Sequence, residues 1–352
     1  MNRTHQIRNT MKRFFRPLAT VCLATLLLTG CHTPAAEGPM RLIFDTDMGN
    51  DVDDAIALGL LNHYINDGRI DLLAIGLTKE GHGPMAYTDM VQTWYGHPDV
   101  PIGAFRKGAQ DSRNYASIVA NAVDSLTGQP YFTTTTADFN ALPDATTLYR
   151  RVLAAQPDHS VTFVTVGFST NMASLLDSEP DEASPLTGRE LISRKVSRLV
   201  MMAGRFNDAA GEYNVIIDIP SAQKVFAEWP TPIVTSPWEL GVEVCYPASS
   251  IENDFGWTPR HPVVEAYKAY MEMPYDRPCW DPTAVLYAVE GDSLFTVSAP
   301  GSIVVADDGR TTFTDSVAQY PRYVLSVTPD QATALRQRMV SLLTDPASAP
   351  QS

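Results

Sequence analysis

Short apolar segments alternate with segments of helical spacing along most of this 352-residue chain, and this alternation constrains its fold more than any other feature. Apolar, strand-like segments lie at residues 41–44, 70–77, 100–103, 161–166, 198–202 and 232–235. Helices are predicted over 55–61, 86–95 and 147–155 and from residue 170 onward. Arg150 and Arg151 are expected on the solvent side of the third helix. The alternation is typical of an α/β fold whose open, mostly parallel sheet carries helices on both faces.

The C-terminal part of the chain has a different pattern. Residues 295–326 are predicted to form short strands, with a β-hairpin turn at Asp307-Asp308-Gly309. A closing helix is predicted over 329–343, because Ala332, Leu335, Met339 and Leu342 recur at helical spacing. The chain shows neither repeats nor an interdomain linker, so we expect one domain over residues 41–345.

The N-terminal residues have the features of an export signal. A basic segment (Arg3, Arg8, Lys12, Arg13 and Arg16) precedes an apolar stretch, residues 18–28, that is too short for a typical membrane span. The stretch ends Leu28-Thr29-Gly30-Cys31, which resembles the lipobox of bacterial lipoproteins. We therefore expect a lipoprotein signal peptide over residues 1–30 and a tether over 31–40, with an ordinary cleaved signal peptide as the alternative. The protein would be exported and lipid-anchored through Cys31, on the periplasmic side or at the cell surface.

Charge and cysteine content bear on the partners of the mature chain. Loss of the five basic leader residues leaves 21 basic against 40 acidic residues, a net charge of −19. A nucleic-acid partner is not expected, since binding to phosphates needs a basic face. The two remaining cysteines, Cys245 and Cys279, are either a pair in an oxidising compartment or two buried thiols.

Five aspartates occur within ten residues where a predicted strand gives way to a predicted helix. The segment reads Asp45-Thr46-Asp47-Met48-Gly49-Asn50-Asp51-Val52-Asp53-Asp54. Open α/β sheets bind ligands at such strand-to-helix turns. Like charges this close repel one another, and oxygen ligands favour a hard cation such as Ca²⁺ or Mg²⁺. The sequence therefore predicts a cation site at this turn.

Two known acidic motifs fit this segment poorly. An EF-hand loop that began at Asp45 would need glycine at its sixth position and glutamate at its twelfth, where this chain has Asn50 and Ile56. A haloacid-dehalogenase-like phosphatase also begins with a strand and Asp-x-Asp, but Gly49 stands where threonine or valine is usual. The phosphatase stays a weaker alternative.

A third pattern extends over most of the chain. The acidic segment, ending Asp-Asp-Ala before an apolar helix, resembles the nucleoside hydrolase family of the inosine–uridine-preferring type. Further segments are similar to that family's motifs in the same order: residues 164–173 (VTVGFSTNMA), 201–204 (MMAG), 212–218 (EYNVIID) and 280–284 (WDPTA). The resemblance covers most of residues 41–345.

The resemblance implies an activity and a set of site residues. Members hydrolyse the N-glycosidic bond of ribonucleosides, giving ribose and free base, and use Ca²⁺ to bind the attacking water and the ribose hydroxyls. It implies Asp47 as general base and metal ligand, Asp54, Asp281 and the carbonyl of Val166 as further metal ligands, Asp53 and Asn214 as ligands of ribose hydroxyls, and Glu212 as ligand of the 5′-hydroxyl. The small-molecule partner would be a nucleoside, and a homo-oligomer is possible.

This chain departs from the family pattern in two places. Five residues separate Asp-x-Asp from Asp-Asp, where three are commonest, and the added acid Asp51 has no assigned role, while Asp45 is expected to support the turn. Trp280 stands where the inosine–uridine type often has histidine. In this respect the chain resembles the purine-preferring branch of the family, in which the base leaves while stacked on aromatic rings, and this resemblance implies purine ribonucleosides as substrates. Such stacking is worth about 1–3 kcal/mol per base in nucleic-acid sites.

Each of these residues also has a structural explanation. Asp281 before Pro282 suits a helix N-cap, Asn214 suits a local turn, Glu212 suits an exposed surface, and Trp280 suits packing. The aromatic rings of Phe168 and Tyr213 are candidates for the pocket wall but are expected in the core. A sugar- or nucleoside-binding lipoprotein without turnover is the alternative function.

Overall fold

A computed structural model describes residues 38–106, 114–316 and 319–348 of the chain. The predicted signal peptide (1–30), Cys31 and the tether up to residue 37 lie outside the described residues. From Gly38 onward the chain forms one compact unit, and Met40, the last residue of the predicted tether, begins the first strand. No helix in the described part has both the length and the apolar character needed to cross a membrane.

A ten-stranded sheet forms the centre of the fold, in the order β11-β10-β12-β6-β5-β4-β1-β2-β3, with β9 paired to β12. The strands are β1 (Met40–Thr46), β2 (Ile70–Leu77), β3 (Ile102–Ala104), β4 (Val161–Thr165), β5 (Val196–Met202), β6 (Ile233–Ser236), β9 (Thr296–Val297), β10 (Gly301–Val305), β11 (Thr311–Asp315) and β12 (Arg322–Ser326). Neighbours from β3 through β12 pair in parallel, whereas β9, β10 and β11 pair antiparallel. The predicted hairpin turn joins β10 to β11, and Gly309 adopts φ +81° there.

The helices and the remaining short strands lie around this sheet. The helices are α1 (Asp53–Asn66), α2 (His82–Trp94), α3 (Tyr115–Ala120), η1 (Phe139–Ala141), α4 (Ala145–Ala154), α5 (Thr170–Leu176), α6 (Gly188–Lys195), α7 (Tyr213–Ile217), α8 (Ile219–Glu228), α9 (Trp238–Glu243), α10 (Ala248–Asn253), α11 (Pro262–Tyr270), α12 (Trp280–Glu290), η2 (Gly291–Leu294), α13 (Pro329–Leu343) and η3 (Pro346–Ser348). Strands β7 (Cys245–Tyr246) and β8 (Arg277–Pro278) form a separate antiparallel pair. The closing helix α13 has the bounds predicted from its spacing.

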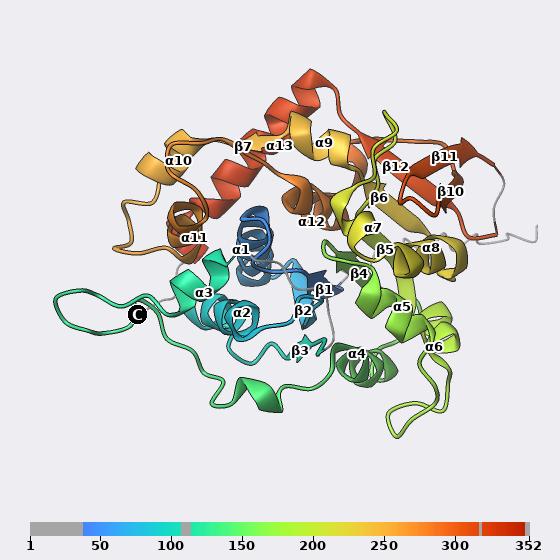
Figure 1. Cartoon of the computed structure of the whole chain (residues 1–352), viewed down its shortest axis with the longest axis horizontal. Helices are drawn as coiled ribbons and strands as arrows, with labels where there is room; N and C mark the ends of the chain where they lie inside the picture. The colour runs from blue at the N-terminus through green and yellow to red at the C-terminus, as the bar shows by residue number, and fades with distance from the viewer. Residues whose placement is uncertain (1–37, 107–113, 317–318, 349–352) are drawn as a thin grey trace, which may run out of the picture. The chain divides into compact units, whose positions relative to one another are not determined.

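Helices cover both faces of the sheet, as predicted. Because side chains alternate along a strand, Leu42 and Phe44 of β1 enter one core while Ile43 enters the other. The first core includes side chains of α1, α12 and α13, and the second those of α4, α5, α6 and α8. Figure 1 shows these two groups of helices on either side of the sheet. Both faces of the central strands are therefore buried, as is typical of parallel sheets.

The acidic segment lies at the topological switch point of the sheet, where the chain stops adding strands on one side of β1 and starts adding them on the other. Strand β1 pairs with β2 on one side and with β4 on the other, so the connections that leave β1 and β4 diverge. Ligands of open α/β sheets bind at the carboxyl ends of the strands at such a point. The turn after β1 begins there.

Two expectations outside the site need correction. The guanidinium of Arg150 is buried, because it pairs with Asp181 (2.8 Å) and donates to the carbonyl oxygens of Ser184 and Leu186. Arg151 is exposed, as expected. Of the two alternatives for Cys245 and Cys279, the structure shows free thiols, but only Cys279 is buried while Cys245 is partly exposed.

Candidate active site

The acidic segment folds as a tight turn between β1 and α1. The backbone N–H of Asn50 donates to the carbonyl of Asp47 (3.3 Å), and Gly49 adopts φ +100° between them. A β-carbon at Gly49 would lie 3.1 Å from that of Ala116. Glycine therefore suits this position both by its backbone angle and by the space available.

Asp45 lies in β1, and its side chain contacts α4, α5 and the end of β4. Its buried carboxylate accepts hydrogen bonds from the Tyr149 hydroxyl, the Asn171 amide (2.7 Å) and the Thr165 hydroxyl (3.1 Å). Burial raises its pKa to about 7, although these hydrogen bonds act in the opposite direction. Asp45 thus supports the turn from within, whereas the other four aspartates face a pocket.

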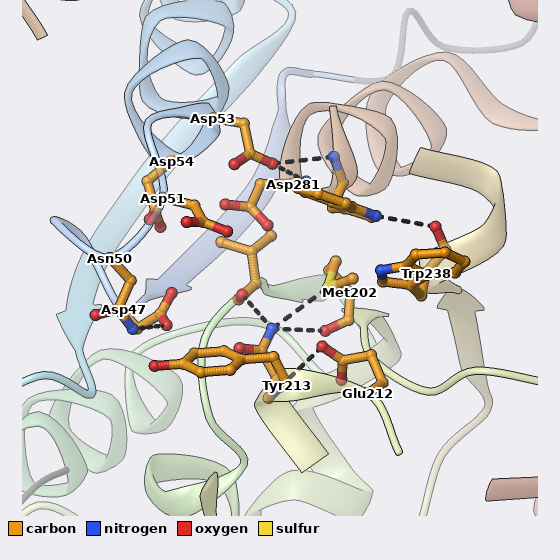
Figure 2. A pocket seen from close by; sticks show the side chains of 13 residues that line it. Asp47, Asn50, Asp51, Asp53, Asp54, Met202, Glu212, Tyr213, Trp238 and Asp281 are labelled. Carbon is orange, nitrogen blue, oxygen red and sulfur yellow. Dashed lines mark hydrogen bonds between the residues drawn. The ribbon is translucent and has the colours of Figure 1, made fainter. Parts of the chain in front are cut away.

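All eight residues that the sequence predicts as site residues line one pocket. They are Asp47, Asp53, Asp54, Val166, Glu212, Asn214, Trp280 and Asp281. They come from the ends of β1 and β4 and from the starts of α1, α7 and α12. Figure 2 shows the side chains that line this pocket. Asn50, Asp51, Met202, Tyr213 and Trp238 complete the lining.

The carboxylates of the pocket are buried and close enough to affect one another. Burial raises the pKa of Asp47 to about 8 and that of Asp53 to about 6. Burial raises the pKa of Asp54 and Asp281 well above the ordinary range, and the neighbouring carboxylates add to the effect. Protein groups alone therefore disfavour full ionisation of the cluster.

Asp53 links the two helices that carry these carboxylates. One of its oxygens accepts the backbone N–H groups of Trp280 (2.9 Å) and Asp281 (3.1 Å), in the first turn of α12. The N-cap position itself is Cys279, which caps with no side-chain hydrogen bond. The N-cap explanation of Asp281 is therefore wrong. The carboxylate of Asp53, from α1, accepts the free backbone N–H groups at the start of α12 instead.

Asp51, which the sequence left without a role, is held by two side chains. The Tyr270 hydroxyl donates to one carboxylate oxygen (2.7 Å), and the guanidinium of Arg277 pairs with the other (2.7 Å). The same guanidinium lies 3.8 Å from Asp53 and 5.0 Å from the ring centres of Tyr270 and Trp280. Asp51 thus fixes the longer acidic turn to the segment before α12.

The opposite wall of the pocket is built from backbone and side-chain hydrogen bonds. The Asn214 amide donates to the carbonyls of Val166 (2.8 Å) and Met202 (3.2 Å). Glu212 is buried and caps α7, accepting the backbone N–H of Asn214 (2.8 Å) and Val215 (3.2 Å). The alternative of an exposed Glu212 is therefore wrong, and burial raises its pKa to about 7.

Aromatic rings form the remaining side of the pocket. The indole N–H of Trp280 donates to the carbonyl of Trp238 (2.9 Å), which fixes the two tryptophans relative to each other. Tyr213, expected in the core, is 37% exposed and lines the pocket, whereas Phe168 is buried as expected. Trp238 was not predicted as a site residue. It lies two residues after the end of β6, at the same edge of the sheet as the other pocket residues, and this position could have identified it.

The donors of the pocket suit a hard cation. Among the described residues, no three histidine, cysteine, aspartate or glutamate side chains are gathered as a ready-made ion site. Yet one oxygen of Asp53 and one of Asp54 are buried without a hydrogen-bond partner. An oxygen-only donor set with buried, unsatisfied carboxylate oxygens has the chemistry that Ca²⁺ or Mg²⁺ requires.

Comparison with known proteins gives one family. A family model described as inosine-uridine preferring nucleoside hydrolase matches residues 42–338. The pyrimidine-specific ribonucleoside hydrolase RihA of Citrobacter koseri is 28% identical over 205 residues, 53% of this chain and 56% of that protein. The chain thus aligns with little more than half of that relative. RihA of Salmonella paratyphi C is 26% identical over 337 residues, 87% of this chain and 97% of that protein.

A solved structure extends the likeness to the fold. The inosine-uridine preferring nucleoside hydrolase of Bacillus anthracis superposes with a TM-score of 0.64 at 19% identity. The match covers 86% of this chain and 99% of that structure. The mostly parallel sheet surrounded by helices is therefore an arrangement that both proteins share.

Proposed function

This chain belongs to the inosine-uridine preferring nucleoside hydrolase family, and from this membership we propose that it hydrolyses the N-glycosidic bond of ribonucleosides in a Ca²⁺-dependent reaction. The products are ribose and free base. The observation that carries the proposal is the single pocket that combines buried carboxylates, an amide and aromatic rings. Carboxylates can bind the sugar hydroxyls and stabilise the positive charge that develops on the sugar, and aromatic rings can stack on the nucleobase.

Asp47, Asp54, Asp281 and the carbonyl of Val166 would hold the cation. When bound, Ca²⁺ supplies a positive charge that orients the attacking water and the ribose hydroxyls and lowers the pKa of that water. The carbonyl of Val166 already accepts the Asn214 amide, but a carbonyl oxygen has two lone pairs and can serve both. Support for this set comes from its oxygen donors and from the unsatisfied oxygen of Asp54.

Asp47 acts as the general base of the proposed reaction. Its carboxylate lines the pocket and is 4% exposed. It takes a proton from the water that attacks the anomeric carbon, while the bond from that carbon to the base nitrogen breaks and its electron pair stays on the base. A nearby carboxylic acid or solvent supplies the proton that the departing base needs, and Asp47 later returns its own proton to solvent. Positive charge develops on the sugar in an oxocarbenium-like transition state. The surrounding carboxylates stabilise that charge more than the neutral ground state.

The remaining side chains position the two halves of the nucleoside. Asp53 and Asn214 bind ribose hydroxyls and Glu212 binds the 5′-hydroxyl. Trp280 provides a stacking surface for the leaving base, and Trp238 and Tyr213 extend it. This aromatic wall supports a preference for purine ribonucleosides, whereas the two RihA relatives are named as pyrimidine-specific.

A panel of nucleosides tests the proposal. Inosine, guanosine, adenosine, uridine and cytidine are incubated with the purified protein, and reducing sugar is measured with Ca²⁺, with EDTA and after Ca²⁺ is restored. We expect release with Ca²⁺, loss with EDTA, recovery on restoration, and faster release from the purines. Binding of nucleosides without release of sugar would instead identify a binding lipoprotein.

We also propose that the protein is exported and lipid-anchored through Cys31. The proposal is supported by the basic segment, the short apolar stretch and the Leu-Thr-Gly-Cys sequence that follows it. Growth with a clickable fatty acid should label the wild-type protein and leave a Cys31→Ala variant unlabelled. Absence of label in the wild type, or label that persists in the variant, contradicts the anchor.

A further inference from the structure

A buried lysine is connected to the proposed general base through one asparagine. The ammonium of Lys79 donates to the side-chain oxygen of Asn50 (2.7 Å), and the amide nitrogen of Asn50 donates to a carboxylate oxygen of Asp47. The three residues are 4%, 2% and 4% exposed, respectively. Lys79 lies two residues beyond the end of β2, the strand next to β1. The connection therefore joins the turns that follow two neighbouring parallel strands.

The chemistry of the lysine sets the direction of both hydrogen bonds. An ammonium carries donors only, so the side-chain oxygen of Asn50 must face Lys79. The NH₂ group of Asn50 must then face Asp47. An ionised carboxylate only accepts hydrogen bonds, so Asp47 selects the same orientation of the Asn50 amide as Lys79 does. Lys79 thus holds Asn50 from the far end, and without the lysine the amide keeps only one of the two charged partners that fix it in place.

The asparagine belongs to the part of the turn that is longer than the family's commonest form. Five residues lie between Asp47 and Asp53, and Asn50 is the central one. On the far side of this segment, Arg277 pairs with Asp51 (2.7 Å). Two positively charged side chains, Lys79 and Arg277, therefore hold the longer segment. Lys79 is the one linked to the proposed general base, Asp47.

We propose that Lys79, acting through Asn50, is a positioning residue for Asp47. Asn50 occupies one carboxylate oxygen and orients the other toward the pocket, where the attacking water and the cation are expected. The inference rests on the proposed function for its catalytic part, but the orientation of Asp47 also affects cation affinity, which is measured without turnover. Loss of partners that orient a metal ligand typically costs 10–100-fold in metal affinity or activity.

The test compares Lys79→Met, Asn50→Ala and the double variant with the wild type. Each protein, freed of metal, is titrated with Ca²⁺ by calorimetry, and kcat and KM for inosine are measured. For Lys79→Met we expect Ca²⁺ affinity to fall by about 10-fold and kcat by 10–100-fold, with KM changed by less than about 3-fold. The double variant should match the more impaired single variant, because one residue acts through the other.

The sign of the change in affinity separates positioning from simple electrostatics. Removal of a positive charge near the acidic pocket, by itself, would strengthen Ca²⁺ binding. Lys195→Met is the matched control, since Lys195 is also a largely buried, paired lysine (15% exposed side chain, 2.9 Å from Asp158). It is the last residue of α6, directly before β5, and so lies at the opposite end of the strands from the pocket. Thermal melts establish that every variant is folded.

Unchanged or tighter Ca²⁺ binding in Lys79→Met overturns the proposal, as do losses in the double variant that equal the product of the two single losses. A wild type that binds Ca²⁺ but releases no ribose contradicts the proposed function alone, and the titration still tests the positioning. A wild type that binds no Ca²⁺ contradicts both.

Discussion

Replacement of Arg277 by methionine removes the cation that holds the longer acidic turn against the segment before α12. Methionine fills much of the same space without a charge. It leaves Asp51 with the Tyr270 hydroxyl (2.7 Å) and removes the ion pair (2.7 Å) and the stacking over two rings, each 5.0 Å from the guanidinium. We expect the variant to be less stable than the wild type but to retain its fold.

The magnitude follows from the exposure of the two partners. The side chains of Arg277 and Asp51 are 13% and 30% exposed, so the pair lies between a surface and a buried ion pair. A hydrogen bond to a charged group contributes about 1.5–3 kcal/mol, and each cation–π contact about 0.5–1 kcal/mol. The free energy of unfolding should therefore fall by about 2.5–5 kcal/mol, of which about 1.5–3 kcal/mol belongs to the ion pair.

A double-mutant cycle isolates the ion pair from the stacking. Urea denaturation of the wild type, Arg277→Met, Asp51→Asn and the double variant gives the coupling free energy directly. Asp51→Asn keeps an oxygen for the Tyr270 hydroxyl and removes the charge. A coupling free energy below about 0.3 kcal/mol, within the usual error of additivity, would refute the claim that this pair fixes the turn.

Three further changes probe the pocket. Because burial raises the pKa of Glu212 from 4.5 to about 7, stability is lost as pH rises from 4.5 through 7, by up to about 3 kcal/mol; urea denaturation of Glu212→Gln should lack this loss. Gly167→Ala places a β-carbon 2.6 Å from the Asp47 nitrogen and should lower kcat/KM about 100-fold, unlike Gly256→Ala, which meets open space. Trp280→Ala should raise KM for inosine about 5- to 100-fold, and an unchanged KM contradicts stacking.

Local patterns were sufficient to predict much of the fold. The alternation of strands and helices, the hairpin at Gly309 and the bounds of α13 each depend on residues close together in the sequence. The motifs also identified eight residues that the structure brings to one pocket. Their individual roles stay predictions.

Several features that the sequence did not predict depend on partners distant in the chain. Asp51 is held by contacts with Tyr270 and Arg277, which lie more than 200 positions later in the chain. Arg150 is buried because a loop with Asp181 folds over it. Spacing and hydropathy carry no information on such contacts, so a charged residue is assigned to the surface by default.

The most direct test of the central claim is product analysis with inosine in phosphate-free buffer containing Ca²⁺. We predict that the wild-type protein releases hypoxanthine and free ribose in equal amounts. In Asp47→Asn, kcat should fall by at least about 100-fold, the range expected for loss of a general base, while inosine still binds. Absence of release by the wild type, or release that Asp47→Asn leaves unchanged, would contradict the account.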